Sequence, residues 1–115
     1  MAYANRPICA YDAMRHLSQE QRVLIAGRAR ALGEPARVRM LEVLARGEQP
    51  VGQLAEAIGM QQSTASKHLQ VLFHAGFVDR RRSASTVIYS LADRELLVWC
   101  RYLGRRHRSA RWRPT

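Results

Sequence analysis

The sequence predicts a mainly α-helical domain of the α+β class. Apolar residues recur with the spacing of a helix in several segments between residues 18 and 75, and glycine or proline separates these segments. Two short β-prone runs with a turn between them follow in residues 77–91. Residues 50–91 are therefore expected to form a helix, a tight turn, a second helix and a basic two-stranded hairpin. This order of elements is typical of a winged helix-turn-helix, in which the hairpin is the wing.

The first two helices are expected over residues 18–32 and from Pro35 onward. Ser18 and Gln21 have the spacing of a capping box, in which each side chain bonds the backbone N–H of the other residue. Pro35 occupies a favoured position in the first turn of a helix. Gly47 is expected to end the second helix by adopting a left-handed cap. The apolar residues of the second helix recur at helical spacing: Val38, Leu41, Leu44 and Ala45.

A third and a fourth helix are expected on either side of a turn at residues 59–62. The third starts near Val51, ends at Gly59, and has apolar residues at helical spacing: Val51, Leu54, Ala55 and Ile58. The fourth covers residues 63–75, and at about 100° per residue one of its sides is apolar. The side predicted to be buried contains Ala65, Leu69 and Leu72. The opposite side is polar and almost uncharged: Ser63, Lys67, Gln70 and His74.

This polar face favours a recognition helix that lies in the major groove of DNA. A merely solvated helix usually carries several Glu and Lys residues, whereas neutral side chains can hydrogen-bond to base edges and phosphates. Gln61, Gln62, Ser63 and Thr64 lie at the start of the helix, where side chains and free backbone N–H groups meet the groove. The alternative is that this cluster provides only capping and turn chemistry.

The wing is predicted from residues 77–82 and 86–91, with a turn at residues 83–85. Three consecutive arginines, Arg80 to Arg82, lie on its first arm. They are expected to clamp phosphates or to probe a minor groove, and the alternative is a solvated run of charge.

A final helix is expected over residues 94–107, capped by Asp93. Trp99 lies beside its apolar stripe, which contains Leu96, Cys100, Leu103 and His107. A long apolar stripe at the end of so small a domain requires a partner.

Composition limits the functions that this chain of 115 residues can have. One domain is expected at 18–107, with an arm at 1–17 and a basic tail at 108–115 that adds nonspecific DNA affinity. The net charge of +10 favours a polyanionic partner. The sequence has no recognisable apolar stretch of the about 20 residues that span a membrane, and no recognisable signal peptide. These observations predict a cytoplasmic protein, in which the thiols are reduced. The chain also lacks a Ser/His/Asp set, a phosphate-cradling glycine loop and clustered carboxylates, so an enzyme is not expected.

Several segments resemble the signatures of the ArsR/SmtB-type bacterial repressors. They are residues 31–37 (ALGEPAR), 54–55 (LA), 62–69 (QSTASKHL) and 75–78 (AGFV), and the resemblance covers residues 18–104. It implies a winged helix-turn-helix homodimer joined through the first and last helices. It also implies binding to an imperfect palindrome in operator DNA and release when an inducer binds. The DNA contacts are then expected from Gln61, Gln62, Ser63, Thr64, Ser66, Lys67, His68, Gln70, Arg80, Arg81 and Arg82.

The metal sites of that family do not carry over to this chain. Metal-sensing relatives have a Cys-x-Cys pair in the third helix, where this chain has residues 54–57 (LAEA). Another family site on the last helix needs Asp-x-His and two further ligands. Here Asp93 is followed by Glu95 and then by Arg106 and Ser109 at the matching spacings. Arginine and serine are not adequate zinc ligands, so no metal site and no cofactor is predicted.

Cys9 and Cys100 remain as candidates for sensing. The resemblance implies that the N-terminal arm passes near the last helix of the other subunit, where Cys9 could approach the partner's Cys100. Neighbouring arginines are expected to lower the thiol pKa, which gives the hypothesis of an oxidisable or soft-metal-binding switch. The alternative is that Cys100 is a small buried apolar residue and that Cys9 has no role.

The predicted function is sequence-specific transcriptional regulation by a homodimeric repressor that an inducer releases from double-stranded operator DNA. The inducer is unknown, and a thiol-reactive agent, a metal and a metalloid are candidates. The alternative is a constitutive architectural nucleic-acid-binding protein without an inducer. A specific repressor should prefer its operator over random DNA by about 10³ or more.

Overall fold

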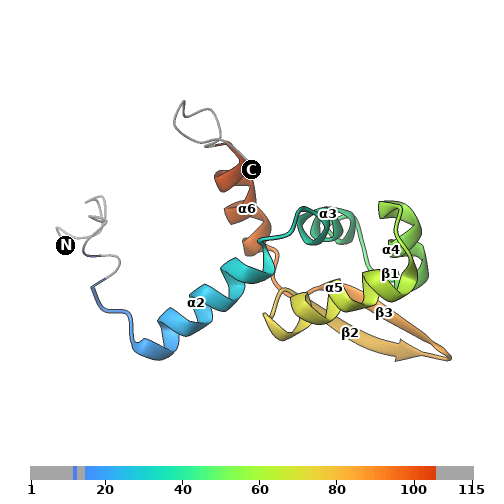
Figure 1. The fold of residues 1–115 in the computed structure, drawn as a ribbon, viewed down its shortest axis with the longest axis horizontal. Helices are drawn as coiled ribbons and strands as arrows, with labels where there is room; N and C mark the ends of the chain where they lie inside the picture. Colours follow the sequence, from blue (N-terminus) through green and yellow to red (C-terminus); the bar gives the residue numbers. More distant parts are fainter. Residues whose placement is uncertain (1–11, 13–14, 106–115) are drawn as a thin grey trace.

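The structure, a computed structural model, describes Asp12 and residues 15–105. Most of the predicted N-terminal arm, the whole predicted tail, Cys9 and His107 lie outside the described residues. The described elements are α2 (Gln19–Ala31), α3 (Pro35–Leu44), β1 (Gln49–Pro50), α4 (Val51–Ile58), α5 (Gln62–His74), β2 (Val78–Ser83), β3 (Thr86–Leu91) and α6 (Glu95–Arg105) (Figure 1).

Helices α3, α4 and α5 and the β2–β3 hairpin pack together as the body of the molecule (Figure 1). Their apolar sides meet in one core, and burial of each large side chain contributes about 1.5 to 3 kcal/mol. The apolar side predicted for the helix after the turn is confirmed, because Ala65, Leu69 and Leu72 are fully buried. The other core residues are Ala31, Met40, Leu41, Leu44, Val51, Leu54, Ala55, Phe77, Val78 and Tyr89.

The helix ends show how local sequence sets the elements. Ser18 Oγ accepts the Gln21 N–H at 3.1 Å and Gln21 Oε1 accepts the Ser18 N–H at 2.8 Å, which confirms the predicted capping box. Gly59 ends α4 with φ of 73°, a left-handed conformation that glycine adopts without strain. The prediction for Gly47 is wrong: α3 already ends at Leu44, and Gly47 has φ of 153°, outside the left-handed helical region.

The sheet has three antiparallel strands in the order β1-β3-β2, one strand more than the predicted hairpin. The added strand contains only Gln49 and Pro50, which pair with Tyr89 and Ile88 of β3. A segment of two residues is too short to show the alternation of apolar and polar residues that marks a strand. Proline also disfavours a strand except at an edge, so the sequence did not indicate β1. Since β1 leads directly into α4, it fixes the start of the helix-turn-helix against the wing.

The wing closes through a two-residue turn at Ala84 and Ser85, between the paired residues Ser83 and Thr86. Ala84 has φ of 55°, which puts a residue with a Cβ in the left-handed region. Such a conformation costs roughly 1 kcal/mol relative to glycine.

Helices α2 and α6 project from the body of the molecule (Figure 1). Large exposed apolar side chains gather on both helices: Val23, Leu24, Ile25, Val98, Trp99, Tyr102 and Leu103. Asp93 Oδ1 accepts the Glu95 N–H at 2.9 Å, which places the predicted cap at the start of α6. Among the described helices, none is long and apolar enough to cross a bilayer.

Candidate nucleic-acid interface

The first turn of α5 is open to an anion. Gln61 precedes the helix in an extended conformation without a capping bond from its side chain, and no acidic residue lies in the first turn. By contrast, the capping box of Ser18 and Gln21 closes the first turn of α2. Uncapped N–H groups at a helix start are the arrangement that binds phosphate. The helix begins at Gln62, one residue before the predicted start, so its free N–H groups lie within the predicted contact segment.

The predicted contact residues of α5 are mostly exposed. Gln61, Gln62, Ser63, Thr64, Lys67 and Gln70 are exposed, whereas Ser66 and His68 are half-buried. The buried residues of α5 hold the helix against the core, so that its polar face remains available to a partner.

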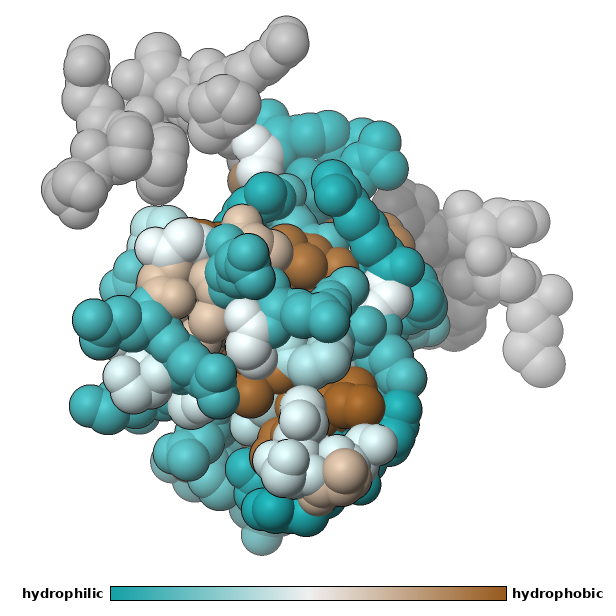
Figure 2. All heavy atoms as spheres, turned by 90° about the vertical axis from the view of Figure 1, so that its right-hand side faces the viewer, coloured by the Kyte–Doolittle hydropathy of each residue, from teal (hydrophilic) through white to brown (hydrophobic). Residues whose placement is uncertain are grey.

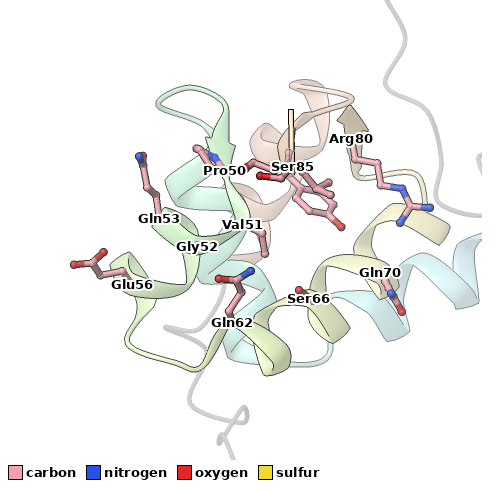
Figure 3. A pocket seen from close by; sticks show the side chains of 13 residues that line it. Pro50, Val51, Gly52, Gln53, Glu56, Gln62, Ser66, Gln70, Arg80 and Ser85 are labelled. Atoms are coloured by element: carbon pink, nitrogen blue, oxygen red, sulfur yellow. The ribbon is translucent and has the colours of Figure 1, made fainter. Parts of the chain in front are cut away.

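A groove of about 670 Å³ lies between α4, α5 and the wing. Gln62, Ser66 and Gln70 line it from α5, because residues four apart share one side of a helix (Figure 3). Arg80 extends from β2 toward the same space (Figure 3). Gln62 also lies close to α4, since a Cβ added to Gly52 would stand 3.3 Å from Oε1 of Gln62. The groove thus combines amide, hydroxyl and guanidinium groups, which are the groups that contact bases and phosphates.

The three arginines of the wing have different surroundings. The guanidinium carbon of Arg80 lies 4.0 Å from the centroid of the Phe73 ring on α5, in a cation–π stack. Arg81 forms an ion pair with Glu48, with Nη2 2.7 Å from Oε1. Side chains alternate along a strand, so Arg82 shares the face of Arg80 and is exposed. The three arginines predicted to clamp phosphates or to probe a minor groove are therefore divided between two faces of the wing.

The end of the molecule that carries α4 and the tip of the wing is mostly hydrophilic, with smaller apolar areas between the polar side chains (Figure 2). The chain also has a net charge of +10. A hydrophilic surface on so basic a chain favours binding of a polyanion over a contact with an apolar partner.

Comparison with known proteins agrees with this geometry. Residues 34–80 match the family model described as "Bacterial regulatory protein, arsR family". The chain is 38% identical over 89 residues to the HTH-type transcriptional regulator NmtR of Mycobacterium tuberculosis, and the match covers 77% of the chain and 69% of that regulator. The chain belongs to the ArsR family.

Further matches support the same family and fold. This ArsR-family chain is 38% identical over 81 residues to a biofilm growth-associated repressor of Agrobacterium fabrum, with 70% of the chain and 66% of the repressor covered. The matched part therefore spans about two thirds of each of these regulators. A solved homodimeric winged helix-turn-helix DNA-binding domain of a possible ArsR-family regulator from Mycobacterium bovis aligns with a TM-score of 0.70 at 28% identity. That alignment covers 89% of the chain and 100% of the domain.

In this ArsR-family chain, Arg37 connects three helices, a role that the sequence did not indicate. Arg37 Nε donates to the Ala31 carbonyl at 2.6 Å and Nη2 donates to the Arg30 carbonyl at 3.2 Å, both at the end of α2. Arg37 Nη1 lies 3.0 Å from Nδ1 of His68 on α5. Because a guanidinium only donates hydrogen bonds, Nδ1 of His68 accepts in this contact. His68 thus contacts Arg37 through its Nδ1 atom, and its predicted DNA contact stays a prediction.

The candidate sensing residues of this ArsR-family chain are only partly described. Cys9 lies outside the described residues, so its predicted approach to the partner's Cys100 stays a prediction. Burial raises the pKa of the Cys100 thiol, and a backbone hydrogen bond lowers it by less. The expectation that neighbouring arginines lower the pKa of Cys100 is wrong, because the pKa is raised and its causes are burial and a backbone hydrogen bond, without an arginine among them. Within the described part of the chain, no three His, Cys, Asp or Glu side chains are grouped so that they could hold a metal ion.

Proposed function

We propose that this ArsR-family regulator is a cytoplasmic homodimeric repressor that binds operator DNA and leaves it when an inducer binds. The carrying observation is that Gln62 in the uncapped first turn of α5, with Ser66 and Gln70 further along the helix, lines one groove with Arg80 of the wing. A helix start, neutral hydrogen-bonding side chains and a guanidinium then meet the same partner. Those groups suit DNA, which offers phosphates and base edges side by side. The proposed activity is binding, without a catalytic role for any residue.

The proposed dimer joins two copies through α2 and α6. These helices carry most of the large exposed apolar residues of the described chain and project from its body (Figure 1). A two-fold pair would bury these side chains and double the basic charge. It would also place two recognition helices about 34 to 36 Å apart, or a multiple of that, which matches successive turns of a palindromic operator.

The proposed DNA contacts differ in kind along α5 and the wing. Gln62, Ser63, Thr64 and Lys67 are assigned to base edges and adjacent phosphates, since they are exposed at or near the open end of α5. Arg80 and Arg82 are assigned to phosphates. Ser66 and Gln70 are assigned to the groove that they line with Gln62 and Arg80. The remaining predicted contacts, at the edges of the interface, are Gln61, His68 and Arg81.

The hypothesis that Cys100 senses the inducer can be tested directly. If Cys100 is part of a thiol switch, Cys100→Ser abolishes operator release by whichever of peroxide, persulfide, arsenite or divalent metals acts on the parent protein. Unchanged release by all of these agents would remove Cys100 from sensing.

The experiment for the DNA-binding proposal has two steps. The bound operator is first selected from a random DNA pool and its affinity for the full chain is measured. Lys67→Ala is then expected to weaken operator binding by about 1 to 3 kcal/mol, because it removes a charged contact from the centre of the exposed face. Arg39→Ala, on an exposed position of α3 away from the groove residues, is the matched control and should change little. A loss from Lys67→Ala no larger than that of the control would contradict the assignment.

A further inference from the structure

A second hollow of about 520 Å³ lies between α3 and α6. None of its lining residues lines the groove beside α5, so it is separate from the proposed DNA interface. Its volume falls within the roughly 300 to 1,000 Å³ of small-molecule sites. The hollow thus lies between α3, a helix of the body, and α6, a helix that projects from the body.

The floor of this hollow is apolar. Leu41 is buried, and Val38, Ala45 and Leu97 are half-buried around it. Cys100 lines the same space, and burial raises the pKa of its thiol, which keeps the sulfur uncharged at neutral pH. An apolar chain or ring placed on this floor would leave water at about 25 cal/mol per Å² of buried apolar surface.

The rim of the hollow carries two guanidinium groups from different helices. Arg46, two residues beyond the end of α3, and Arg101 on α6 are both exposed. Within the described residues, no carboxylate lies within 4.0 Å of either group. Glu42 also lines the hollow, and its Oε2 lies 3.6 Å from Nη1 of Arg39, which offsets part of its charge. Two arginines without carboxylate partners beside an apolar floor are complementary to an anion with an apolar body.

We propose that this hollow is the inducer site and that its ligand is an amphipathic monocarboxylate. The apolar part of the ligand lies on the floor, and its carboxylate bonds Arg46 and Arg101. The regulatory half of this proposal rests on the proposed function, whereas the binding half does not require DNA.

The position of the hollow provides a route from the ligand to the operator. No residue of α6 is fully buried, and the helix contacts the core mainly through the partly buried Leu96 and Leu97. A ligand bound between α3 and α6 therefore adds contacts that favour one direction of α6 relative to the body. In the proposed dimer, that direction sets the spacing of the two recognition helices. A ligand that favours a spacing unlike that of the operator weakens DNA binding by shifting this equilibrium.

The binding half is tested by calorimetry on the full chain without DNA, with decanoate as the probe and decyltrimethylammonium as a cation with an alkyl tail of similar length. Decanoate is expected to bind saturably below its micelle concentration, and the cation at least tenfold more weakly. Arg46→Gln combined with Arg101→Gln should weaken decanoate binding about tenfold or more. Ala45→Phe, which fills the hollow, should abolish it, while Arg105→Gln on the same helix outside the hollow should leave it unchanged.

The regulatory half is tested by fluorescence anisotropy of labelled operator DNA. Decanoate should raise the dissociation constant of the parent protein at least fivefold and should leave that of the Arg46→Gln/Arg101→Gln variant unchanged. The proposed site would be overturned if decanoate did not bind saturably, or if the cation bound equally well. It would also be overturned if the substitutions in the hollow left decanoate binding unchanged. Binding at the hollow without a change in operator affinity would overturn its role as the inducer site. A chain that binds no operator at all would instead refute the proposed function, and the calorimetric result would stand independently of it.

Discussion

Arg80 and Arg81 are neighbours in the sequence but have different partners. Arg80 stacks on Phe73 beside the groove, and this stack holds its guanidinium near α5. Arg81 is paired with Glu48, which already balances its charge. The period of two in a strand could have separated these residues from the sequence alone, but the partners Phe73 and Glu48 could not be read from it. Glu48 is 33 residues from Arg81 along the chain, and Phe73 lies on a different element from Arg80, so no local pattern encodes either contact.

We predict that Arg80→Gln and Arg81→Gln differ in their effect on operator binding. Arg80→Gln should weaken binding by about 1 kcal/mol or more and should lower the slope of log K against log[salt] by about 1, because one phosphate contact is lost. Arg81→Gln should lower the slope by clearly less, since its charge is shared with Glu48. Titrations at four salt concentrations measure both slopes. Equal slopes for the two variants would refute the division of the wing into two faces.

The raised pKa of Cys100 predicts slow reaction of its thiol near neutral pH. Only the thiolate is alkylated, and a pKa raised by burial lowers the thiolate fraction at any pH below it. In a Cys9→Ser background, iodoacetamide should react more slowly with the folded chain than with the urea-unfolded chain at pH 7.5. The folded rate should still be rising with pH where the unfolded rate begins to level off. A folded thiol that reacts faster than the unfolded one would indicate a lowered pKa and would restore the arginine-activated switch.

The elements of the helix-turn-helix were predictable because each is marked locally. The apolar period and Gly59 place α4, the turn and the buried side of α5, and the β-prone runs place the wing. By contrast, β1 is defined only by its pairing with β3, and Pro50 argues against a strand in isolation. The contact of Arg37 with α2 and α5 is equally non-local. The features that could not be predicted from the sequence are therefore contacts between elements.

The contacts of Arg37 predict a measurable contribution to stability. Arg37→Met keeps the apolar stem but removes the donors to the two α2 carbonyls and to His68. The free energy of unfolding should fall by about 1 to 3 kcal/mol, because partly buried acceptors lose charged donors. Urea unfolding measures this difference. Arg39→Met on the same helix is the control and should cost less than about 1 kcal/mol, since its ion pair with Glu42 is exposed. Similar losses in both variants would show that Arg37 does not connect the helices.

The shape of the whole molecule depends on the direction of α2 and α6. The two helices project from the body and expose apolar side chains that the body does not cover (Figure 1). The sequence indicated that the last helix requires a partner, and the resemblance implied that the first helix joins it. The structure adds that α2 contacts α5 near the ends of the two helices, where Arg28 Nε donates to the Ala75 carbonyl at 3.4 Å.

The proposed dimer predicts a specific effect of a charge on α6. Val98 is 69% exposed in the single chain, so Val98→Asp should leave its fold intact. In a dimer the new carboxylate would be buried without a partner, at a cost of several kcal/mol, and the chain should become monomeric. Analytical ultracentrifugation measures the mass and circular dichroism checks the fold. Ala92→Asp adds the same charge at an exposed position outside α2 and α6 and should remain dimeric. A dimeric Val98→Asp chain would place the interface elsewhere.

The ratio of two dissociation constants shows whether the full chain recognises a particular DNA sequence. The dissociation constants for the selected operator and for random DNA of equal length are measured together at physiological salt. We expect the operator to bind about 10³-fold or more tightly than random DNA. Affinities that agree within about tenfold would contradict it, because charge alone would then explain the binding and the chain would be an architectural nucleic-acid-binding protein.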